Sequence, residues 1–398
     1  MTLFFMFLAA MDFFARFFVW VYLAALAFMC LPNRKLHIDF SILCLMVLSL
    51  SFLVFDPISQ DRLLDMLKPF TYPICYLIGS SLYIGNRDEK FVLANGEKRV
   101  SNVIYVLAGG TAVHYVLNMI INWGAETRIV VDYWTKVEIS ATSQATICCF
   151  LLAVAIAFLF TKVGKKKKII AVAALVLIIS YNLILAGRTI FALMIIMAVV
   201  VYLYTRWVNK EKLLKTVIIA VVIFLLLSLL YNANAFGIKS AFESSNFYTR
   251  FYGGTYTQEI DDDKRLDYKL QYLEHFLDYP WGGENINELV GHHAHDLYLD
   301  TYDEASVFAF LAVVAYILMS LIRMVKCIKN DRLTVATRTL VLCIYLSCNI
   351  IFWLEPILRG MPWLFSAYCF MDGAVTALLA QMEDMQHSDT YLSISKTI

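Results

Sequence analysis

The sequence has few charged residues. Of its 398 residues, 16% are charged and 60% are hydrophobic, whereas a soluble domain carries about a quarter charged residues. A soluble chain of this length could not hide so much apolar surface. The hydrophobic residues come in blocks of roughly 16–23, the length that a helix needs to cross about 30 Å of hydrocarbon. The composition therefore predicts an all-α polytopic membrane protein.

Three other features are scarce or missing. The formal net charge is only +1, which gives no electrostatic basis for binding nucleic acid. All nine cysteines lie in or beside apolar blocks and none lies in the long polar loop, so no disulfide framework is expected. Apolar residues follow Met1 without a basic segment, so we do not expect a cleaved signal peptide.

The apolar blocks predict about eleven spanning helices. Residues 2–31 are too long for one span and too short for two, and Asp12 and Arg16 interrupt them. We expect one tilted helix there, with a twelfth span as the alternative. The predicted spans are 13–31, 39–55, 63–85, 100–122, 140–161, 169–186, 189–205, 216–232, 305–325, 339–354 and 363–380.

The basic residues predict the orientation of these spans. Alternate connections, counted with Lys396 in the tail, carry 21 of the 33 Lys and Arg residues, and the connections between them carry few. By the positive-inside rule, the basic connections and the C-terminus lie in the cytoplasm. The basic connections are those with Arg34, Arg87, Lys165–Lys168, Lys210 and Lys326.

One long connection, residues 233–304, is expected outside the cytoplasm. It divides the chain into an N-terminal bundle of about eight spans (1–232), the loop (233–304), and a C-terminal bundle of about three spans with a cytoplasmic tail (305–398). The loop holds 14 of the 32 acidic residues and four of the seven histidines. Leu266, Leu270, Leu273 and Leu277 recur on one face of a helix. This amphipathic helix should lie against the membrane surface or the bundle and end near Pro280.

Arginines in two places suit an anionic ligand. Arg188 stands between two apolar spans, where a guanidinium is costly unless an anion or carbonyl groups meet it. Its planar fork fits phosphate oxygens, although a snorkelling arginine is the alternative. Lys264 and Arg265 open the amphipathic helix, where basic residues oppose the helix dipole. An anion-binding role explains them, and surface ion pairing to Asp261 or Asp262 is the alternative.

A histidine motif lies late in the loop. His292, His293 and His295 precede Asp296, and Glu304 stands at the start of the next span. A histidine with a carboxylate to orient it suits a general base, and we choose His295 with Asp296. Because the histidines lack a spaced partner, we expect no metal. A solvated polar loop is the alternative.

These motifs resemble those of the O-antigen ligase and polymerase superfamily, in the family's order and with its long outer loop late in the chain. The matching segments are Leu185-Ala186-Gly187-Arg188-Thr189, Arg265 with Pro280 and Gly283, and His293-Ala294-His295-Asp296-Leu297-Tyr298-Leu299 followed by Glu304. The motifs cover roughly residues 170–325. Asp296 replaces the family's usual Asn, and Ala305-Ser306 stands where the family prefers a Gly-rich start of the next helix.

The resemblance implies an extracytoplasmic glycosyltransferase in the bacterial cytoplasmic membrane, without a cofactor. It would polymerise undecaprenyl-diphosphate-linked oligosaccharide units into a surface polysaccharide of O-antigen or capsule type. Its partners would be that lipid-linked donor, membrane lipid, and chain-length regulators or other polysaccharide-assembly proteins. Arg188, Arg265 and Lys264 would bind the diphosphate, while His295, Asp296 and Glu304 would carry catalysis. Secondary candidates are His292, His293 and Arg250. A ligase using another acceptor and a lipid-intermediate flippase are the alternatives.

Overall fold

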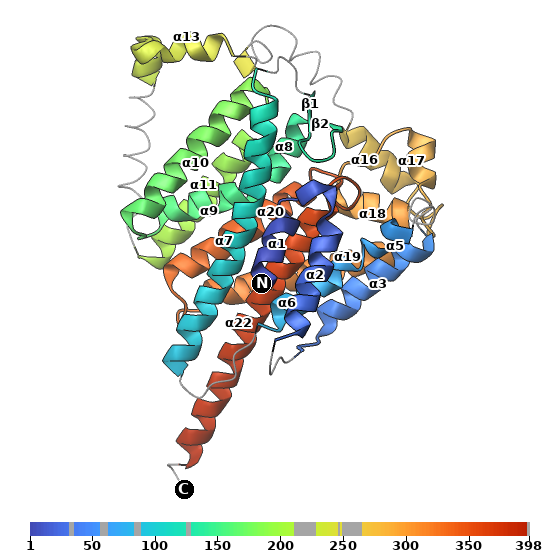
Figure 1. The fold of residues 1–398 in the computed structure, drawn as a ribbon, viewed down its shortest axis with the longest axis vertical. Coiled ribbons are helices and arrows are strands. Elements are labelled where there is room, and N and C mark those ends of the chain that lie inside the picture. Colours follow the sequence, from blue (N-terminus) through green and yellow to red (C-terminus); the bar gives the residue numbers. More distant parts are fainter. Residues whose placement is uncertain are drawn as a thin grey trace.

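The computed structural model describes residues 1–398 apart from 32–35, 56–62, 83–88, 125–128, 211–227, 246, 249–264 and 396–398. The structure is 78% helical. In the described part, one two-stranded antiparallel hairpin pairs β1 (Ile129–Val131) with β2 (Glu138–Ser140). The prediction of an all-α protein holds, with this short hairpin added (Figure 1).

The helices follow one another through the whole chain. Before the hairpin lie α1 (Thr2–Ala10), η1 (Phe13–Ala15), α2 (Phe17–Met29), α3 (Phe40–Phe55), α5 (Leu63–Leu67), α6 (Thr71–Ser80) and α7 (Glu89–Ile121). After it lie α8 (Ala141–Ile147), α9 (Cys149–Phe160), α10 (Lys165–Ile184), α11 (Thr189–Val208), η2 (Ala235–Gly237), α13 (Ile238–Glu243), α16 (Arg265–Glu274), α17 (Asn285–Val290), α18 (Leu297–Ala305), α19 (Val307–Lys329), α20 (Val335–Phe352), α21 (Ile357–Gly360) and α22 (Pro362–Ser395).

Within the described residues, six helices are long and apolar enough to cross a membrane, or seven if the pair α8 and α9, bent by 57°, counts as one span. They include α10, α11, α19 and α20 at full length, together with parts of α7 and α22. Two shorter apolar helices, α2 and α3, correspond to the first two predicted spans. These are the helices of a membrane protein. Most of the predicted span 216–232 lies outside the described residues.

Two predicted spans are broken, which corrects the sequence-based boundaries. Residues 2–31 form α1 and α2 rather than one tilted helix, because the backbone takes positive φ at Asp12, Phe14 and Ala15. The Asp12 carboxylate accepts the N–H of Phe17 at 3.2 Å and so stabilises the break. In the predicted span 63–85, the described residues form the short helices α5 and α6 on either side of Pro69, which has no N–H to continue a helix.

Glycines allow α6 to pack tightly against α22. A Cβ at Gly79 would overlap the carbonyl of Phe370, and one at Gly373 would overlap the carbonyl of Tyr76. Small residues at such a crossing let the two backbones approach, as is common between helices in membranes. This contact holds the short helix α6 inside the bundle.

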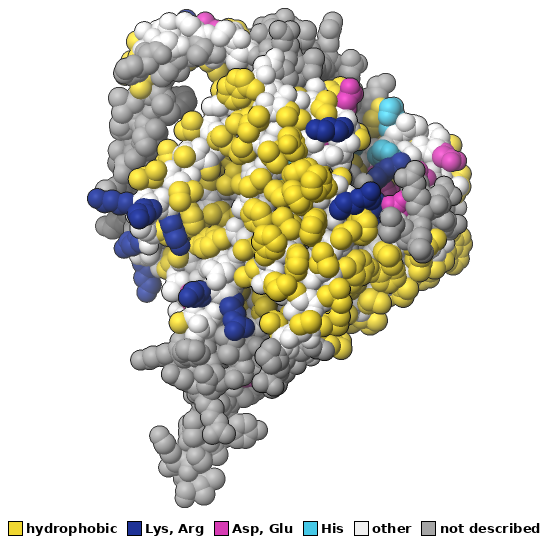
Figure 2. Space-filling model, viewed as in Figure 1, with side chains coloured by type: hydrophobic (Ala, Val, Ile, Leu, Met, Phe, Trp, Pro, Cys, Tyr) yellow, Lys and Arg dark blue, Asp and Glu magenta, His cyan; other side chains and the backbone are white. Residues whose placement is uncertain are grey.

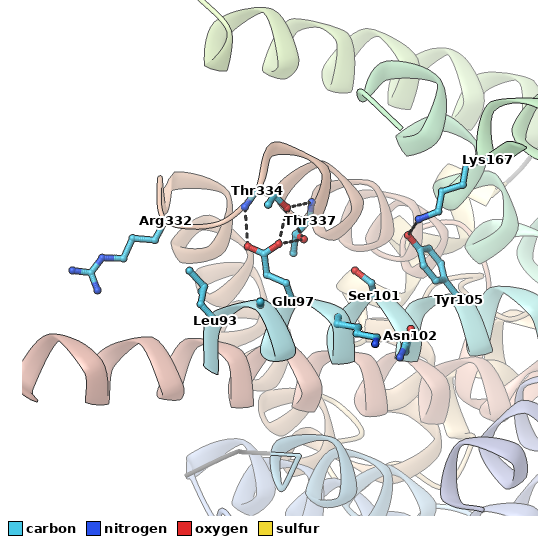
Figure 3. A pocket seen from close by; sticks show the side chains of 11 residues that line it. Leu93, Glu97, Ser101, Asn102, Tyr105, Lys167, Arg332, Thr334 and Thr337 are labelled. Carbon is cyan, nitrogen blue, oxygen red and sulfur yellow. Dashed lines mark hydrogen bonds between the residues drawn. The ribbon is translucent and has the colours of Figure 1, made fainter. Parts of the chain in front are cut away.

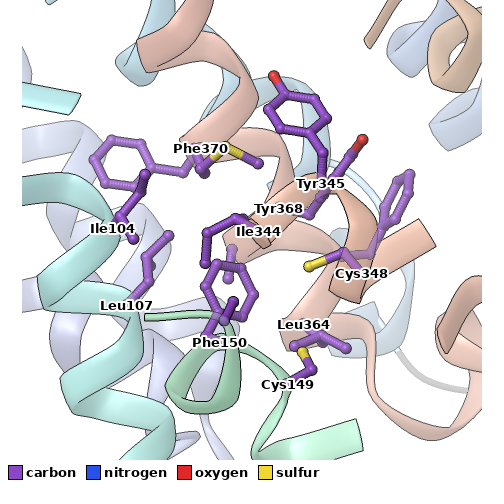
Figure 4. Close-up of a cluster of buried hydrophobic side chains, with 14 of the residues drawn as sticks. Ile104, Leu107, Cys149, Phe150, Ile344, Tyr345, Cys348, Leu364, Tyr368 and Phe370 are labelled. Atoms are coloured by element: carbon purple, nitrogen blue, oxygen red, sulfur yellow. The ribbon is translucent and has the colours of Figure 1, made fainter. Parts of the chain in front are cut away.

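The core lies where α7, α9, α20 and α22 meet. Leu107, Phe150, Ile344 and Leu364 are fully buried there, one from each helix (Figure 4). A side chain of this size contributes roughly 1.5–3 kcal/mol when it leaves water. Since lipid replaces water around the outer faces, close packing rather than burial alone orders these helices.

A buried ion pair joins α19 to α22. Arg323 donates from Nε to the Asp372 carboxylate at 3.1 Å and from a terminal nitrogen to Ser41 Oγ at 2.8 Å, while the Tyr345 hydroxyl also donates to Asp372. The sequence predicts that Arg323 belongs to the cytoplasmic basic connection that contains Lys326. In the structure, the Arg323 side chain is only 11% exposed and serves the bundle interior.

Helix α20 runs between two chemically different ends of the molecule. Its 18 residues, at a rise of 1.5 Å each, make it about 27 Å long. The loop end carries α16, α17, α18 and the β hairpin, and the basic end carries the start of α10 and the loop before α20 (Figure 1). In Figure 2, hydrophobic side chains cover the middle of the molecule. Histidine and charged side chains gather beside α16–α18, and further Lys and Arg lie at the lower left.

Candidate functional site

The histidine motif forms a tight loop between α17 and α18. Gly291 and His295 both have positive φ, at +79° and +58°. The Asp300 carboxylate accepts the N–H of Ala294 and the N–H of Asp296, each at 2.9 Å, and so closes the loop from inside. Histidine tolerates this backbone region better than most residues. Asp300 therefore positions His295, a role that the sequence analysis missed.

Asp296 has a different task from the one predicted. Its carboxylate accepts the N–H groups of Tyr298 at 3.0 Å and Leu299 at 2.8 Å, which caps α18. Its other oxygen lies 3.1 Å from Lys269 Nζ. In the described part of the chain, no side chain hydrogen-bonds the His295 ring. The predicted pairing of Asp296 with His295 is absent because the carboxylate is used by the helix N-terminus and by Lys269.

Helix α16 brings two cations to this loop. Arg265 and Lys269 are one helical turn apart, so they share a face. Lys269 donates to the Trp353 carbonyl at 2.9 Å in addition to its contact with Asp296, and Arg265 lies 3.9 Å from Glu355. Arg265 begins the described helix, as predicted. Lys264 and Arg250 lie outside the described residues.

A third cation, Arg359 in α21, comes from the short connection between α20 and α22. Its guanidinium lies 3.0 Å from Glu284 and 3.8 Å from Glu304. Glu304, predicted as a catalytic carboxylate, is buried and faces this arginine. Its surroundings fit a carboxylate that holds Arg359 in place. Nothing in the local sequence pointed to Arg359, because the connection carries no motif.

The three histidines have different surroundings. The His292 ring stacks on Tyr268 with ring centroids 4.6 Å apart. Burial and then Arg359 lower the pKa of His293. Burial, followed by the charges of Arg265, His293, Lys269 and His292, lowers the pKa of His295 to about 4. The His295 imidazole is therefore neutral at pH 7, as a base must be.

Glu355 connects this site to the region of Arg188. Burial raises the pKa of Glu355, and the nearby Arg265 and Thr142 in α8 oppose this rise. The start of α8 lies beside Gly187, where an added Cβ would stand 3.6 Å from the Cβ of Ala141. Arg188, at the N-cap of α11, therefore neighbours the same helix start as Glu355. The start of α8 thus lies near both Glu355 and the backbone that precedes Arg188.

A separate histidine–aspartate pair was also missed. His114 Nε2 lies 2.6 Å from an Asp132 oxygen that also accepts from Asn118, and both side chains are nearly inaccessible. The other Asp132 oxygen accepts the N–H groups of Trp134 and Thr135, so the pair anchors the β hairpin to α7. A histidine inside a predicted span was the available signal. Its burial indicates a structural role.

No protein-family model matches the chain, and no curated protein matches it either. The family resemblance of the three motifs therefore stays a prediction. Among the described residues, no group of three or more His, Cys, Asp or Glu side chains is placed to hold a metal ion. The expectation of metal-independent chemistry also stays a prediction.

Proposed function

We propose that this protein is a glycosyltransferase that extends a lipid-diphosphate-linked oligosaccharide at its loop end. The observation that carries the proposal is the placement of Arg265 and Lys269 on one face of α16, beside a neutral His295. Cations suit a leaving diphosphate, and a neutral imidazole suits removal of a proton from a sugar hydroxyl. Both tasks belong to one transfer reaction.

The cations are held ready by carboxylates. Arg265 faces Glu355, Lys269 faces Asp296, and Arg359 faces Glu284 and Glu304. The contact of Arg265 with Glu355 is long, at 3.9 Å. A diphosphate oxygen can compete with Glu355 for the Arg265 guanidinium, and Glu355 can take up a proton because burial raises its pKa.

Substrate binding also improves His295 as a base. The charges of Arg265 and Lys269 contribute to its low pKa. An anionic diphosphate beside these cations offsets their field, so the pKa of His295 rises toward its ordinary value near 6.5. The imidazole then accepts the hydroxyl proton more strongly when the donor is present.

The outer face of α16 suits contact with lipid. Leu266, Leu270 and Leu273 are 69%, 49% and 57% exposed, while Tyr272 on the opposite face is buried. An apolar helix face left open at the end of a membrane bundle lies well in the headgroup and acyl boundary. We infer that the cations of α16 lie just above the membrane, at the depth of a lipid-linked diphosphate.

The proposal extends to the topology, the substrate and the partners of the protein. The chain has eleven or twelve spans in the bacterial cytoplasmic membrane, with the loop end outside and the basic end in the cytoplasm. The donor is undecaprenyl-diphosphate-linked oligosaccharide, the product is a longer lipid-linked polysaccharide, and chain-length regulators are partners. No cofactor or metal takes part.

The test uses purified protein in detergent with lipid-diphosphate oligosaccharide as donor and acceptor. Wild type should form longer lipid-linked chains, and His295→Ala should lose about 10²–10⁴-fold in rate, the usual contribution of a general base. His275→Ala is the matched control, because His275 lies in the same loop but pairs with Asp278 at 2.9 Å. It should retain full activity.

Four outcomes would count against the proposal. If His295→Ala is as active as wild type, His295 is not the general base. If a chelator abolishes activity, the reaction depends on a metal ion. If wild type makes no product in detergent but moves the lipid across vesicle membranes, the protein is a flippase. Transfer to an acceptor other than the lipid-linked unit would make it a ligase.

A further inference from the structure

A cavity of about 750 Å³ lies at the basic end, on the far side of the bundle from the histidine loop. The C-terminal ends of α9 and α11, the start of α10 and the first turn of α20 form its walls. Its basic lining residues are Lys162, Lys168 and Arg206, and its apolar ones include Leu159 and Phe160. The Arg206 guanidinium lies over the Tyr202 ring, 5.2 Å from its centroid, which fixes its direction.

The described lining of this cavity differs from that of two nearby cavities in the carboxylates that it contains. A second cavity of about 550 Å³ contains Glu97, which accepts hydrogen bonds from the N–H and hydroxyl of Thr334 and from the hydroxyl of Thr337 (Figure 3). A third, of about 490 Å³, contains Asp331, which pairs with Arg338 at 2.8 Å. The described lining of the 750 Å³ cavity includes no carboxylate.

We propose that this cavity binds the phosphate of an anionic phospholipid headgroup. Three basic side chains and no carboxylate are found among the described lining residues, and the volume lies in the range of small-molecule sites. The apolar wall from Leu159 and Phe160 accepts the start of an acyl chain, which a free phosphate would not need. Basic pockets between spanning helices at the cytoplasmic side are known to suit anionic lipids.

The first turn of α20 strengthens the proposed site. Val335 and Ala336 line the cavity, and the positive end of the helix dipole favours an anion there. Glu97 already satisfies Thr334 from the other side of the same turn. The lipid phosphate would therefore bind along the face of α20 that Glu97 leaves open.

A matched pair of double variants tests the site. Lys162→Gln/Lys168→Gln removes two lining charges, whereas Lys165→Gln/Lys166→Gln removes two exposed charges from the same region without touching the lining. Native mass spectrometry of the purified full chain, titrated with phosphatidylglycerol or phosphatidylcholine, measures bound lipid. We expect one preferred phosphatidylglycerol on wild type and on the control, and about 10-fold weaker binding to the lining variant.

The results distinguish a specific phospholipid site from general electrostatic attraction of anionic lipid to the basic end. Equal weakening in both double variants, or equal binding of both lipids to wild type, overturns the proposal. A thermal-shift arm compares inorganic phosphate with short-chain phosphatidylglycerol at equal concentration. Stabilisation by phosphatidylglycerol alone supports the lipid, whereas equal stabilisation by phosphate identifies a soluble anion and overturns the lipid assignment. Unchanged Tm of both variants without ligand confirms that they fold.

Discussion

The two ends of α20 use positive charge in different ways. At the loop end, Arg265, Lys269 and Arg359 each face a carboxylate from another segment. At the basic end, the cavity with Lys162, Lys168 and Arg206 has no carboxylate among its described lining residues. Paired cations are held in a fixed geometry, which suits chemistry on a bound diphosphate. Cations around an open cavity raise the local attraction for any anion, which suits binding.

Among the comparisons between the two ends, the largest effect is expected from one conservative change, Arg→Lys. Arg265→Lys keeps the charge but loses the planar fork, so the transfer rate should fall about 10- to 100-fold. Arg332→Lys makes the same change at an exposed position of the basic end and should leave the rate within about twofold of wild type. Initial rates of chain elongation measure both. If Arg265→Lys were as active as wild type, Arg265 would have no place in the diphosphate site.

A second comparison replaces a positioning carboxylate at each end. Asp300→Ala leaves the N–H groups of Ala294 and Asp296 unpaired in a buried loop, so stability should fall by about 2 kcal/mol. Glu97→Ala removes the carboxylate that accepts hydrogen bonds from Thr334 and Thr337 at the start of α20, so stability should fall by about 1 kcal/mol. Only Asp300→Ala should also reduce transfer, because only that loop holds His295. Thermal unfolding measures the stability of both variants, and initial rates measure their transfer activity. An inactive Glu97→Ala variant with a normal Tm would show that the basic end also takes part in transfer.

The fold class followed from the sequence because lipid imposes a simple rule on composition and block length. The breaks within helices could not be predicted from the sequence, because hydropathy is averaged over a block and is insensitive to a local change of backbone direction. Asp12 was visible as an interruption, yet only the positive φ values around it show two helices where one was expected. The pair of Arg323 and Asp372 was missed for a related reason: they lie in two different predicted spans, 305–325 and 363–380, and are 49 residues apart in the sequence.

The site was partly predictable. Arg265 and the histidine motif lie within one loop of the sequence, and the structure brings them together. Lys269 could have been found, because it lies one turn after Arg265 on the polar face. Arg359 and Glu355 could not, since they come from a connection after α20 that folds back onto the loop end. The role of Asp296 was misjudged because adjacency in sequence to His295 does not bring its carboxylate to the ring.

The pH dependence of stability should show two opposing groups at the loop end. Burial lowers the pKa of His295 to about 4, so its contribution to stability is lost as pH falls from about 6.5 to 4. Burial raises the pKa of Asp300 to about 7, so its contribution is lost as pH rises from about 4 to 7. In wild type these trends oppose each other. In His295→Gln only the second remains, so Tm should fall steadily by a few degrees from pH 4.5 to 6.5, and parallel profiles for both proteins would contradict these assignments.

The smallest expected effect compares the starts of α19 and α20. Ser306 precedes α19 with φ +100° and ψ 167°, a region that essentially only glycine adopts without strain, and its buried hydroxyl has no partner among the described residues. Thr334 precedes α20 in ordinary extended geometry, and its hydroxyl accepts the N–H of Thr337 at 3.3 Å. Ser306→Gly should therefore relieve more strain than the added freedom of glycine costs in the unfolded chain, for a net gain of about 1 kcal/mol. Thr334→Gly should do the opposite, because it removes a working cap and the contacts with Glu97. Thermal unfolding of both variants in the same detergent measures the difference. A lower Tm for Ser306→Gly would show that the serine side chain, and not the backbone angle, determines how α18 joins α19.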